Sequence, residues 1–233
     1  MTLGHTDIHN HILPALDDGF QCVEDSLEAV RVMAFNGCRE LIFTPHINPD
    51  MFPDTTESVC REAYGAFSVM IPKEWNVATH LAAEYMVGPG FENRVGRDAG
   101  ALLSFPDGSV LIEMSCLERS RNLEQAVFEL NLAGQKPILA HPERYLYMSE
   151  CLNDFDRIVE MGCELQMSMS SLTGTYGPGS MRILNYLLKR KLYAHIATDL
   201  HSLSQLSDIL AYRPVFFQRR RLRIQSAAWN NIS

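Results

Sequence analysis

Histidine and carboxylate residues recur along this 233-residue chain in short motifs with a spacing of two. His9 and His11 form the first pair, and Asp199 and His201 form the last. Residues two apart in an extended segment project from the same face, so each pair is placed to give two ligands to one ion. Imidazole together with carboxylate suits Zn²⁺, Mn²⁺ or Fe better than it suits Ca²⁺ or a metal selected by thiolates. The two motifs therefore indicate divalent-metal chemistry.

Other ligand-type residues follow short apolar runs that read as β-strands. The motifs at the ends of these runs are HNH (9–11), TPH (44–46), AE (83–84), IE (112–113), AH (140–141) and TDLH (198–201). In (β/α) barrels the C-terminal ends of the strands meet at one face and build the active site. A lone HxH occurs often by chance, but five of the eight histidines lie at such ends, interleaved with carboxylates. The joint pattern predicts a metal site assembled from several strands.

The elements that would position these residues alternate along the chain. Strands are predicted over 6–12, 40–44, 77–83, 110–114, 137–140, 163–169 and 193–198. Helices are predicted over 23–36, 58–69, 123–133, 152–161 and 181–191. This alternation is typical of parallel strands joined by crossover helices, so we expect an α/β fold. Without an internal repeat or a linker-like stretch, residues 1–233 are expected to form one domain, and its closure into a barrel is expected from periodicity alone.

Composition narrows the classes of function. A formal net charge of −8 argues against binding to a phosphate backbone, so no nucleic-acid partner is expected. The six cysteines include no CxxC pair, which favours reduced thiols in a cytosolic protein. The N-terminus lacks the pattern of a signal peptide, and no apolar stretch approaches the roughly 20 residues of a transmembrane helix. We therefore expect a cytoplasmic protein without a transmembrane segment.

Three histidines and one basic run are given other interpretations. His5 is expected to lie on the surface, whereas His80 and His195 fall inside strand patterns and are expected to be buried and hydrogen-bonded. The run Arg219-Arg220-Arg221 is interpreted as a solvated helix face, with a contact for an anionic partner or a membrane surface as the alternative.

Several segments together resemble one known family. They are DIHNHILPALDDG (7–19), TPH (44–46), AAEY (82–85), LIEMS (111–115), AHPERY (140–145) and TDLHS (198–202). In order and spacing they are similar to the PHP-family metal-dependent tyrosine-protein phosphatases of capsular and exopolysaccharide gene clusters. The resemblance runs from about residue 6 to about residue 202. It implies a distorted, TIM-like (β/α) barrel with the metal site at the C-terminal ends of the strands.

The resemblance also implies a set of ligands for up to three divalent ions, with Mn²⁺ favoured and Fe or Zn²⁺ as alternatives. The first ion would take His9, His11 and Asp199, and Glu84 would bridge it to the second. The implied ligands of the other two ions are Glu113 and His141 for the second, and Asp18, His46 and His201 for the third. Asp17 is the alternative to Asp18, because only the register of the motif favours the latter.

The chemistry expected of such a cluster is hydrolysis of a phosphate ester. Neighbouring metals share a water, lower its pKa and direct the hydroxide in line at phosphorus. Arg144, three residues after His141, is the candidate catalytic residue that would clamp the phosphate. The polar loop 168–179 either shapes the mouth of the site or is an ordinary connection between strand and helix.

Four functions remain to be weighed. The favoured one is hydrolysis of phosphotyrosine on a protein, with the tail of a bacterial tyrosine autokinase that regulates capsule or exopolysaccharide synthesis as the expected partner. The nearest alternative is a small-molecule phosphoesterase such as a histidinol-phosphate phosphatase. An amidohydrolase-like enzyme would need a bridging lysine where this chain has carboxylates. A non-catalytic metal-binding protein is disfavoured, because all nine ligand positions are filled.

Overall fold

The structure, a computed structural model, describes residues 3–213 of the chain, without the side chains of residues 92, 93 and 97–99. The basic run Arg219-Arg220-Arg221 lies outside the described residues.

All the strands that pair within the described residues pair in parallel, and they form two sheets. One sheet has the order β1-β2-β4, and the other has the order β3-β5-β6-β7-β8-β9. The bounds are β1 Thr6–Asp7, β2 Glu40–Phe43, β3 His46–Ile47, β4 Ala78–Leu81, β5 Glu84–Met86, β6 Val110–Glu113, β7 Pro137–Ala140, β8 Glu164–Ser168 and β9 Tyr193–Ala197.

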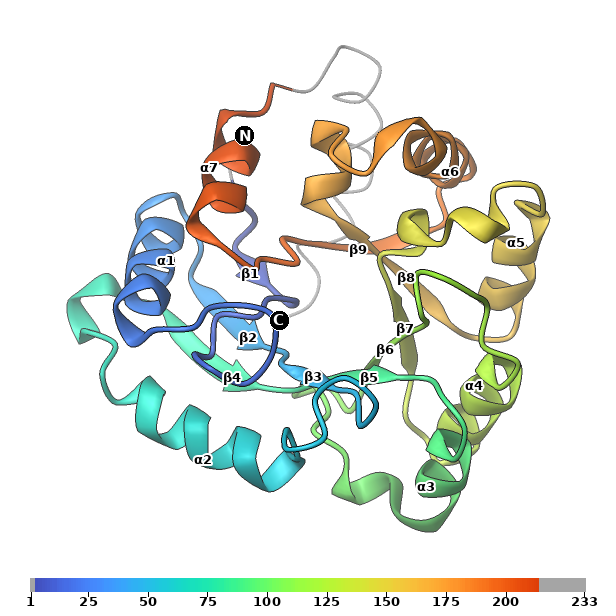
Figure 1. The fold of residues 1–233 in the computed structure, drawn as a ribbon, viewed down its shortest axis with the longest axis horizontal. Helices are drawn as coiled ribbons and strands as arrows, with labels where there is room; N and C mark the ends of the chain where they lie inside the picture. Colours follow the sequence, from blue (N-terminus) through green and yellow to red (C-terminus); the bar gives the residue numbers. More distant parts are fainter. Residues whose placement is uncertain (1–2, 214–233) are drawn as a thin grey trace.

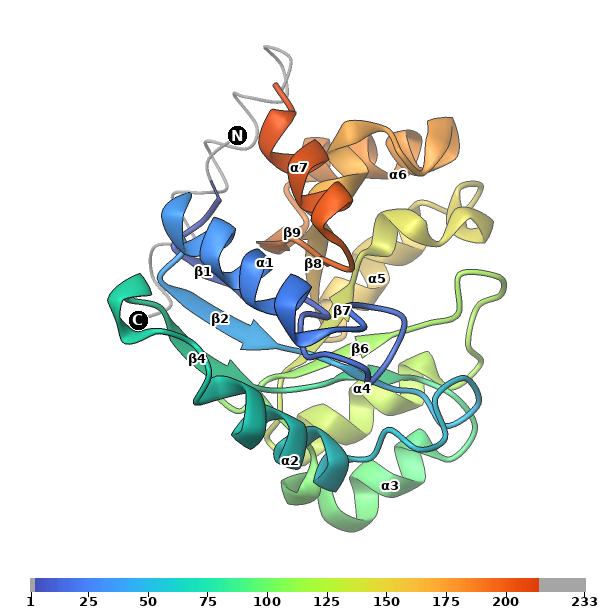
Figure 2. The same ribbon diagram turned by 60° about the vertical axis from the view of Figure 1, so that its left-hand side comes forward.

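Helices surround the strands, which gather in the centre of the molecule (Figure 1). The α-helices are α1 Val23–Phe35, α2 Glu57–Ser68, α3 Phe91–Asp98, α4 Leu123–Leu132, α5 Asn153–Glu160, α6 Gly177–Arg190 and α7 Leu203–Ala211. Short 3₁₀ turns cover Lys73–Trp75, Ala99–Ala101, Pro142–Arg144, Leu146–Met148 and Met169–Thr173. Figure 2 shows α1 and α2 lying along the sheet of β1, β2 and β4. No helix within residues 3–213 is long and apolar enough to cross a membrane.

The hydrophobic core follows from the composition of the strands. Every residue of β6 (VLIE) and β7 (PILA) is buried, as expected for parallel strands that are covered on both faces. The helices turn one apolar stripe toward the strands, as α1 does with Ala29, Val30 and Met33. This packing leaves the strand ends as the part of the core where polar side chains can gather.

Two features of the chain position the ends of the strands. Pro45 has no N–H to donate to a neighbouring strand. It lies between β2, which belongs to the first sheet, and β3, which belongs to the second. At the other end of the chain, the segment after β1 meets the segment after β9 through a parallel bridge between Asn10 and Leu200. Asp199 N–H donates to the His9 carbonyl at 2.8 Å and thereby holds the HNH and TDLH motifs side by side.

The predicted alternation of strands and helices is confirmed, with several differences in extent. The predicted strand 6–12 is paired only at Thr6–Asp7, because the backbone from His9 onward bonds to the 199–200 segment and to Thr44 instead of continuing a ladder. Helix α6 begins at Gly177, four residues before the predicted start. The elements β3, β5, α3 and α7 were not predicted. The described pairing gives two parallel sheets, so closure into a barrel stays a prediction.

Candidate metal centre

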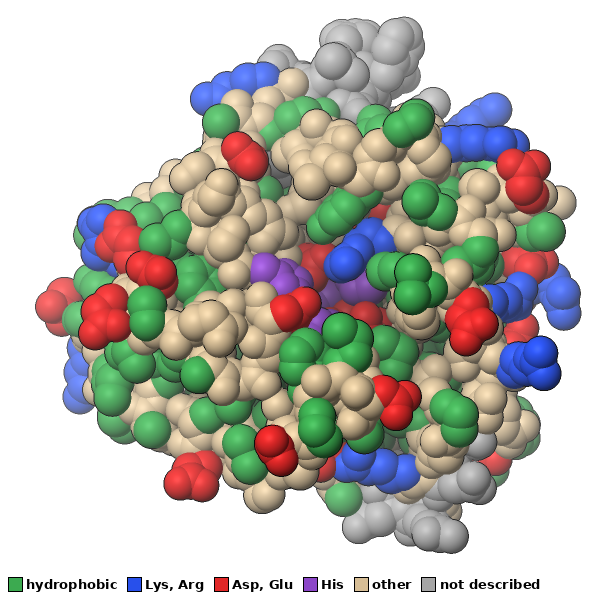
Figure 3. Space-filling model, in the orientation of Figure 1, with side chains coloured by type: hydrophobic (Ala, Val, Ile, Leu, Met, Phe, Trp, Pro, Cys, Tyr) green, Lys and Arg blue, Asp and Glu red, His purple; other side chains and the backbone are tan. Residues whose placement is uncertain are grey.

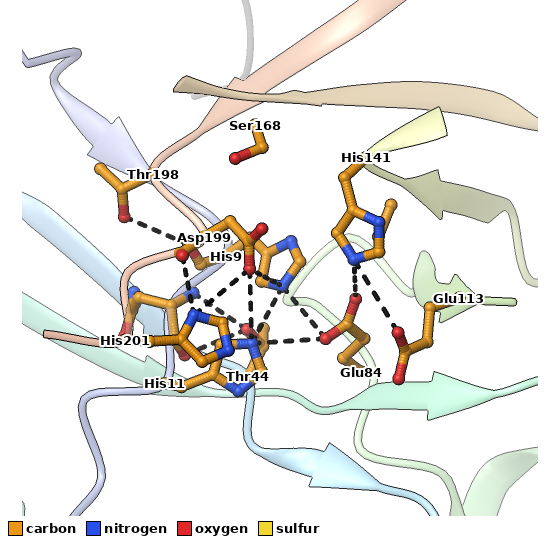
Figure 4. Close-up of polar contacts among 12 residues, drawn as sticks. His9, His11, Thr44, Glu84, Glu113, His141, Ser168, Thr198, Asp199 and His201 are labelled. Atoms are coloured by element: carbon orange, nitrogen blue, oxygen red, sulfur yellow. Dashed lines mark hydrogen bonds and ion pairs between the residues drawn. The ribbon is translucent and has the colours of Figure 1, made fainter. Parts of the chain in front are cut away.

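The nine predicted ligands lie together at the C-terminal ends of the strands. They come from the segment after β1, the loop before α1, the first residues of β3 and β5, the end of β6 and the segments after β7 and β9. All but Asp18 and His46 are labelled in Figure 4. Their ligand atoms fall into four overlapping groups, each with its atoms within 4.8 Å of one another. The groups are His11, Asp18, His46 and His201; His9, His11 and Glu84; His9, His141 and Asp199; and His46, Glu84 and Glu113. Arg144 lies at the edge of the same cluster, 3.1 Å from Asp199.

Glu84 occupies the centre of the cluster. Its Oε2 lies 3.2 Å from His9 Nε2, 3.3 Å from His11 Nε2 and 3.1 Å from His46 Nδ1. Its Oε1 lies 3.0 Å from His141 Nε2 (Figure 4). A fully buried carboxylate facing four imidazoles has the surroundings of a ligand shared between ions.

The donor atoms of the cluster fit divalent cations. Five buried side-chain atoms in it have no hydrogen-bond partner within the described residues, namely His46 Nδ1, Glu84 Oε2, Glu113 Oε1, His141 Nδ1 and Asp199 Oδ1. Leaving a buried polar atom without a partner costs about 1–3 kcal/mol, and more for a charged group. Metal coordination would satisfy the four of these atoms that face the cluster, which are all but His141 Nδ1, and the mixture of imidazole and carboxylate suits Mn²⁺, Fe and Zn²⁺.

A second layer of side chains orients the imidazoles. His11 Nδ1 lies 2.8 Å from Asp17 Oδ2, and His9 Nδ1 lies 2.8 Å from Gln166 Oε1. When these Nδ1 atoms carry the protons, the Nε2 atoms are left to face the cluster, as is usual for metal-binding histidines. Asp17 is thus engaged with His11, whereas Asp18 Oδ1 lies 3.5 Å from His46 Nε2. The geometry therefore supports Asp18 rather than Asp17 as the ligand.

Gly19 explains why a glycine follows the two aspartates. A Cβ at this position would lie 2.2 Å from the His11 carbonyl oxygen and 2.5 Å from the His11 Cβ. No side chain fits at that distance, so only glycine lets the loop return against His11. The Gly19 N–H donates to Asp17 Oδ1 at 3.0 Å, which fixes the carboxylate that holds the His11 ring.

Two candidate ligands have left-handed backbones. The φ angle is 33° at His141 and 53° at Asp199, a region that non-glycine residues seldom occupy. Strained residues of this kind collect at functional sites because the surrounding structure holds them there. In both, the turn at the end of a strand directs the side chain back over the cluster.

The charges of the cluster depend on burial and on its neighbours. Burial raises the pKa of Glu84, but nearby His9 and His46 outweigh that effect, so the pKa lies well below its usual value. Burial lowers the pKa of His46, but Glu113 and Glu84 prevail and raise the pKa to about 9. Burial and the neighbouring His11 lower the pKa of His201 to about 4. The central carboxylate is therefore ionised and His201 is neutral at neutral pH, whereas His46 carries a proton that a bound metal ion would have to displace.

Arg144 stands at the mouth of the cluster, on the 3₁₀ turn that follows β7. Its Nη1 donates to Asp199 Oδ2 at 3.1 Å, and its guanidinium lies 5.1 Å from the centre of the Tyr176 ring. Arg144 and Tyr176 line a cavity of about 330 Å³ that also reaches Asp18 and His201. Figure 3 shows histidine side chains in a hollow of this face, with acidic and basic side chains at its rim.

The other sequence expectations fare differently. His5 is exposed, and His195 is buried with its Nε2 2.6 Å from Glu164, as expected. The expectation of a core position for His80 is wrong: its side chain is 41% exposed and pairs with Glu40, because β4 lies at the edge of its sheet. The six cysteines are free.

Two further residues at the site were missed in the sequence. Gln166 could have been noticed in the sequence, because it is an amide inside the apolar strand β8 and a buried polar group needs a hydrogen-bond partner. In the structure that partner is His9. Tyr176 gives no such signal, because only the fold brings it to Arg144.

Parallel α/β architecture with a histidine and carboxylate cluster at the strand ends is the framework of a metal-dependent hydrolase. The profile of the family described as "Capsular polysaccharide synthesis, CpsB/CapC" matches residues 5–211, and the chain belongs to that family.

Two of the matches to known proteins inform the comparison. The chain is 32% identical to the tyrosine-protein phosphatase YwqE of Bacillus subtilis over 203 residues, which is 84% of this chain and 77% of the relative. It superposes with a TM-score of 0.78 and 30% identity on a chain from the crystal structures of YwqE from Bacillus subtilis and CpsB from Streptococcus pneumoniae. That match covers 88% of this chain and 84% of the other, and those proteins are described as metal-dependent tyrosine phosphatases.

A more distant likeness concerns the fold alone. Histidinol phosphate phosphatase of Lactococcus lactis superposes with a TM-score of 0.56 at 12% identity, over 96% of this chain and 92% of the other.

Proposed function

We propose that this protein is a metal-dependent tyrosine-protein phosphatase that acts on the phosphotyrosine tail of a bacterial tyrosine autokinase regulating capsule or exopolysaccharide synthesis. Membership of the CpsB/CapC family and the likeness to YwqE support the reaction. The observation that carries the proposal most directly is the position of Glu84 Oε2, between 3.1 and 3.3 Å from nitrogens of three histidines. That arrangement is suited to hold metals and has no other evident use.

The proposed ligands keep the distribution expected from the sequence, with Mn²⁺ as the favoured ion. His9, His11 and Asp199 would hold the first metal, Glu113 and His141 would hold the second, and Glu84 would be shared. Asp18, His46 and His201 would hold the third. His46 Nδ1 also lies 2.9 Å from Glu113 Oε1, so His46 stands between the second and third positions. When bound, such metals activate the attacking water and neutralise charge on the phosphoryl oxygens.

Arg144 is the residue of the chain that would contact the phosphate directly, without a metal in between. Its guanidinium is held between Asp199 and the Tyr176 ring, so its direction toward the cavity is fixed before substrate arrives. A planar, always-charged guanidinium can bind two phosphate oxygens at once. Asp199, held by Arg144 on one side and by the cluster on the other, links the clamp to the metal centre.

Two structural statements belong to the same proposal. Residues 1–233 form one domain, and the two sheets close into a distorted PHP-type barrel. The bridge between Asn10 and Leu200 supports closure on one side. The bond from Glu84 N–H to the Pro45 carbonyl at 3.1 Å supports continuity near the junction of the two sheets.

The proposed reaction is tested by comparing substrates under one metal condition. The kcat/KM values of a phosphotyrosine peptide, free phosphotyrosine, a phosphoserine peptide and histidinol phosphate are measured with Mn²⁺. A tyrosine-protein phosphatase should prefer the phosphotyrosine peptide, because binding energy from the flanking peptide adds to that of the phosphate. A marked preference for histidinol phosphate would overturn the substrate and would favour a small-molecule phosphoesterase.

A further inference from the structure

The cavity at the metal centre continues into a groove that extends beyond the space a phosphate group would occupy. The first cavity, of about 330 Å³, reaches Asp18, Arg144 and His201. A second cavity, of about 580 Å³, shares Thr173, Thr175 and Asp208 with the first. It extends toward the end of α7 and touches none of the nine candidate ligands. The extra space therefore suits parts of a substrate that lie away from the phosphate.

The two walls of this groove are held together at its metal end. One wall is α7, and the other is the Met169–Thr173 turn with the residues that lead into α6. Gln205 on α7 donates to Ser170 Oγ and to the Asp199 carbonyl, both at 2.7 Å. Its Oε1 accepts from the His201 N–H at 2.6 Å. The metal end of the groove is thus fixed relative to the metal centre.

Asp208 gives the groove its charge. The residue is exposed and forms no ion pair within residues 3–213. Arg213 also lines the second cavity, and its Nη1 donates to three backbone carbonyls at the end of α7, at 2.9–3.1 Å. Threonine hydroxyls line much of the remainder. Because the Arg213 guanidinium is bound to carbonyls at the C-terminal end of α7, the unpaired Asp208 is the group in this lining that complements a positively charged side chain on a polypeptide.

The helix geometry places Asp208 at a defined distance from Ser204, which lines the first cavity. Ser204 and Asp208 are one turn apart on the same face of α7, which is about 6 Å at the rise of 1.5 Å per residue. An extended peptide advances about 3.3 Å per residue, so this distance corresponds to roughly two residues.

We propose that the segment flanking the phosphotyrosine lies extended in this groove, and that Asp208 selects a lysine or arginine about two to three residues from the phosphotyrosine. This inference rests on the proposed function, because it assumes that phosphotyrosine occupies the metal end. It adds a sequence preference for the substrate and names the residue that sets it.

The test measures binding, so it does not depend on turnover. Fluorescently labelled peptides carry a non-hydrolysable phosphonate analogue of phosphotyrosine, with Lys, Ala or Glu placed in turn at positions −3 to +3. Dissociation constants are determined by fluorescence anisotropy for the Mn²⁺-loaded protein, for Asp208→Asn and for Asp208→Lys. Glu62→Lys is the matched charge-reversal control, since Glu62 is an exposed acid on α2 outside the groove.

The native protein should bind the Lys peptide about two- to fivefold more tightly than the Glu peptide at one or two positions, as expected for an exposed ion pair. Asp208→Asn should abolish this ratio and Asp208→Lys should invert it, while Glu62→Lys keeps it. The preference should also weaken at high salt, because the pair is open to solvent. An unchanged ratio in Asp208→Lys would overturn the groove assignment.

A separate measurement distinguishes failure of the inference from failure of the proposed function. The native protein is assayed on free phosphotyrosine, which makes no contact along the groove. Hydrolysis of free phosphotyrosine combined with an unaltered peptide ratio in Asp208→Lys rejects the groove alone. Absence of hydrolysis of every phosphotyrosine substrate rejects the proposed function and with it the occupant of the groove.

Discussion

At the scale of single residues, the site is defined by buried polar groups that have few possible partners. Glu84 is fully buried, and its Oε2 faces three imidazole nitrogens without a hydrogen bond of its own. The amide of a glutamine has a similar shape but carries no charge, so it would hold a cation far more weakly. Substitution by glutamine therefore separates the role of the charge from that of the packing.

We predict that Glu84→Gln loses at least one metal ion per chain and several orders of magnitude in kcat, because activated water and charge stabilisation are lost together. Metal content by elemental analysis is the primary measurement. His80→Ala is the control, because His80 is a histidine outside the cluster that pairs with Glu40 on β4, at the edge of its sheet. A full metal complement in Glu84→Gln would show that the carboxylate is not a shared ligand.

Arg144 is predicted to act on the substrate and not on the metals. Arg144→Ala should lower kcat/KM for any phosphoester by an amount that corresponds to a loss of roughly 2–4 kcal/mol in transition-state stabilisation. The metal content should be unchanged. Arg157→Ala serves as the control, since the side chain of Arg157 is 71% exposed on α5. Equal activity of the two variants would remove Arg144 from the reaction.

At the scale of elements, the strand ends are held in place by side chains that are not ligands themselves. The buried Tyr145 hydroxyl donates to the Ala140 carbonyl and accepts from the Met114 N–H, both at 3.0 Å. Ala140 precedes His141, and Met114 follows Glu113. One hydroxyl thus fixes the spacing between the ends of β6 and β7, and with it two candidate ligands.

Tyr145→Phe should lower the free energy of unfolding by about 1–3 kcal/mol, because it leaves the Met114 N–H buried without its partner. Urea denaturation measures the loss. Tyr147→Phe should cost less, since the Tyr147 hydroxyl bonds the Ser115 carbonyl in a half-buried place where water can substitute. A smaller loss in Tyr145→Phe than in Tyr147→Phe would contradict this role.

A pH-dependent contact between Glu164 and His195 joins β8 to β9. The His195 hydrogen bond, assisted by Lys136, lowers the pKa of Glu164 to about 2. A carboxyl whose pKa is lower in the folded state stabilises the fold above its unfolded pKa, near 4.5, and loses that contribution as pH falls toward 2.

Glu164→Gln should therefore lower the free energy of unfolding by about 1 kcal/mol at neutral pH, the value for a half-buried charged hydrogen bond. The difference from the native protein should shrink between pH 4.5 and pH 2. Urea titrations at several pH values give this difference. Glu160→Gln, an exposed change on α5, should show no such trend, and a constant difference for Glu164→Gln would argue against the pKa shift.

The sequence predicts elements well where one local signal dominates. Apolar runs such as PILA coincide with β7 to the residue, and the helical period and acidic start of α1 place it correctly. The short strands β3 and β5 are missed, because two or three residues carry no periodicity and their pairing depends on partners far along the chain. Helix α7 is missed although Ser202 caps it by accepting from the Gln205 N–H at 3.2 Å.

At the scale of the whole molecule, the fold converts a linear series of motifs into one site. Parallel strands bring all their C-terminal ends to one face, which is why ligand-type residues at strand ends were predictable from the sequence alone. The sequence could not show which side chains orient them, because Asp17, Gln166 and Tyr145 act through distances that only the packed structure sets. For the same reason the groove beside α7 is invisible in the sequence: its two walls are separated by α6 and β9 along the chain.

The central claim is that phosphotyrosine hydrolysis by this chain requires divalent metal held by the nine clustered residues. It is tested most directly by the rate of phosphotyrosine-peptide hydrolysis measured against the number of metal ions bound per chain. The ions are removed by a chelator and restored with Mn²⁺. We predict that the rate falls to background as the metal is removed and returns as it is restored. Undiminished hydrolysis by protein shown to be free of metal would contradict the claim.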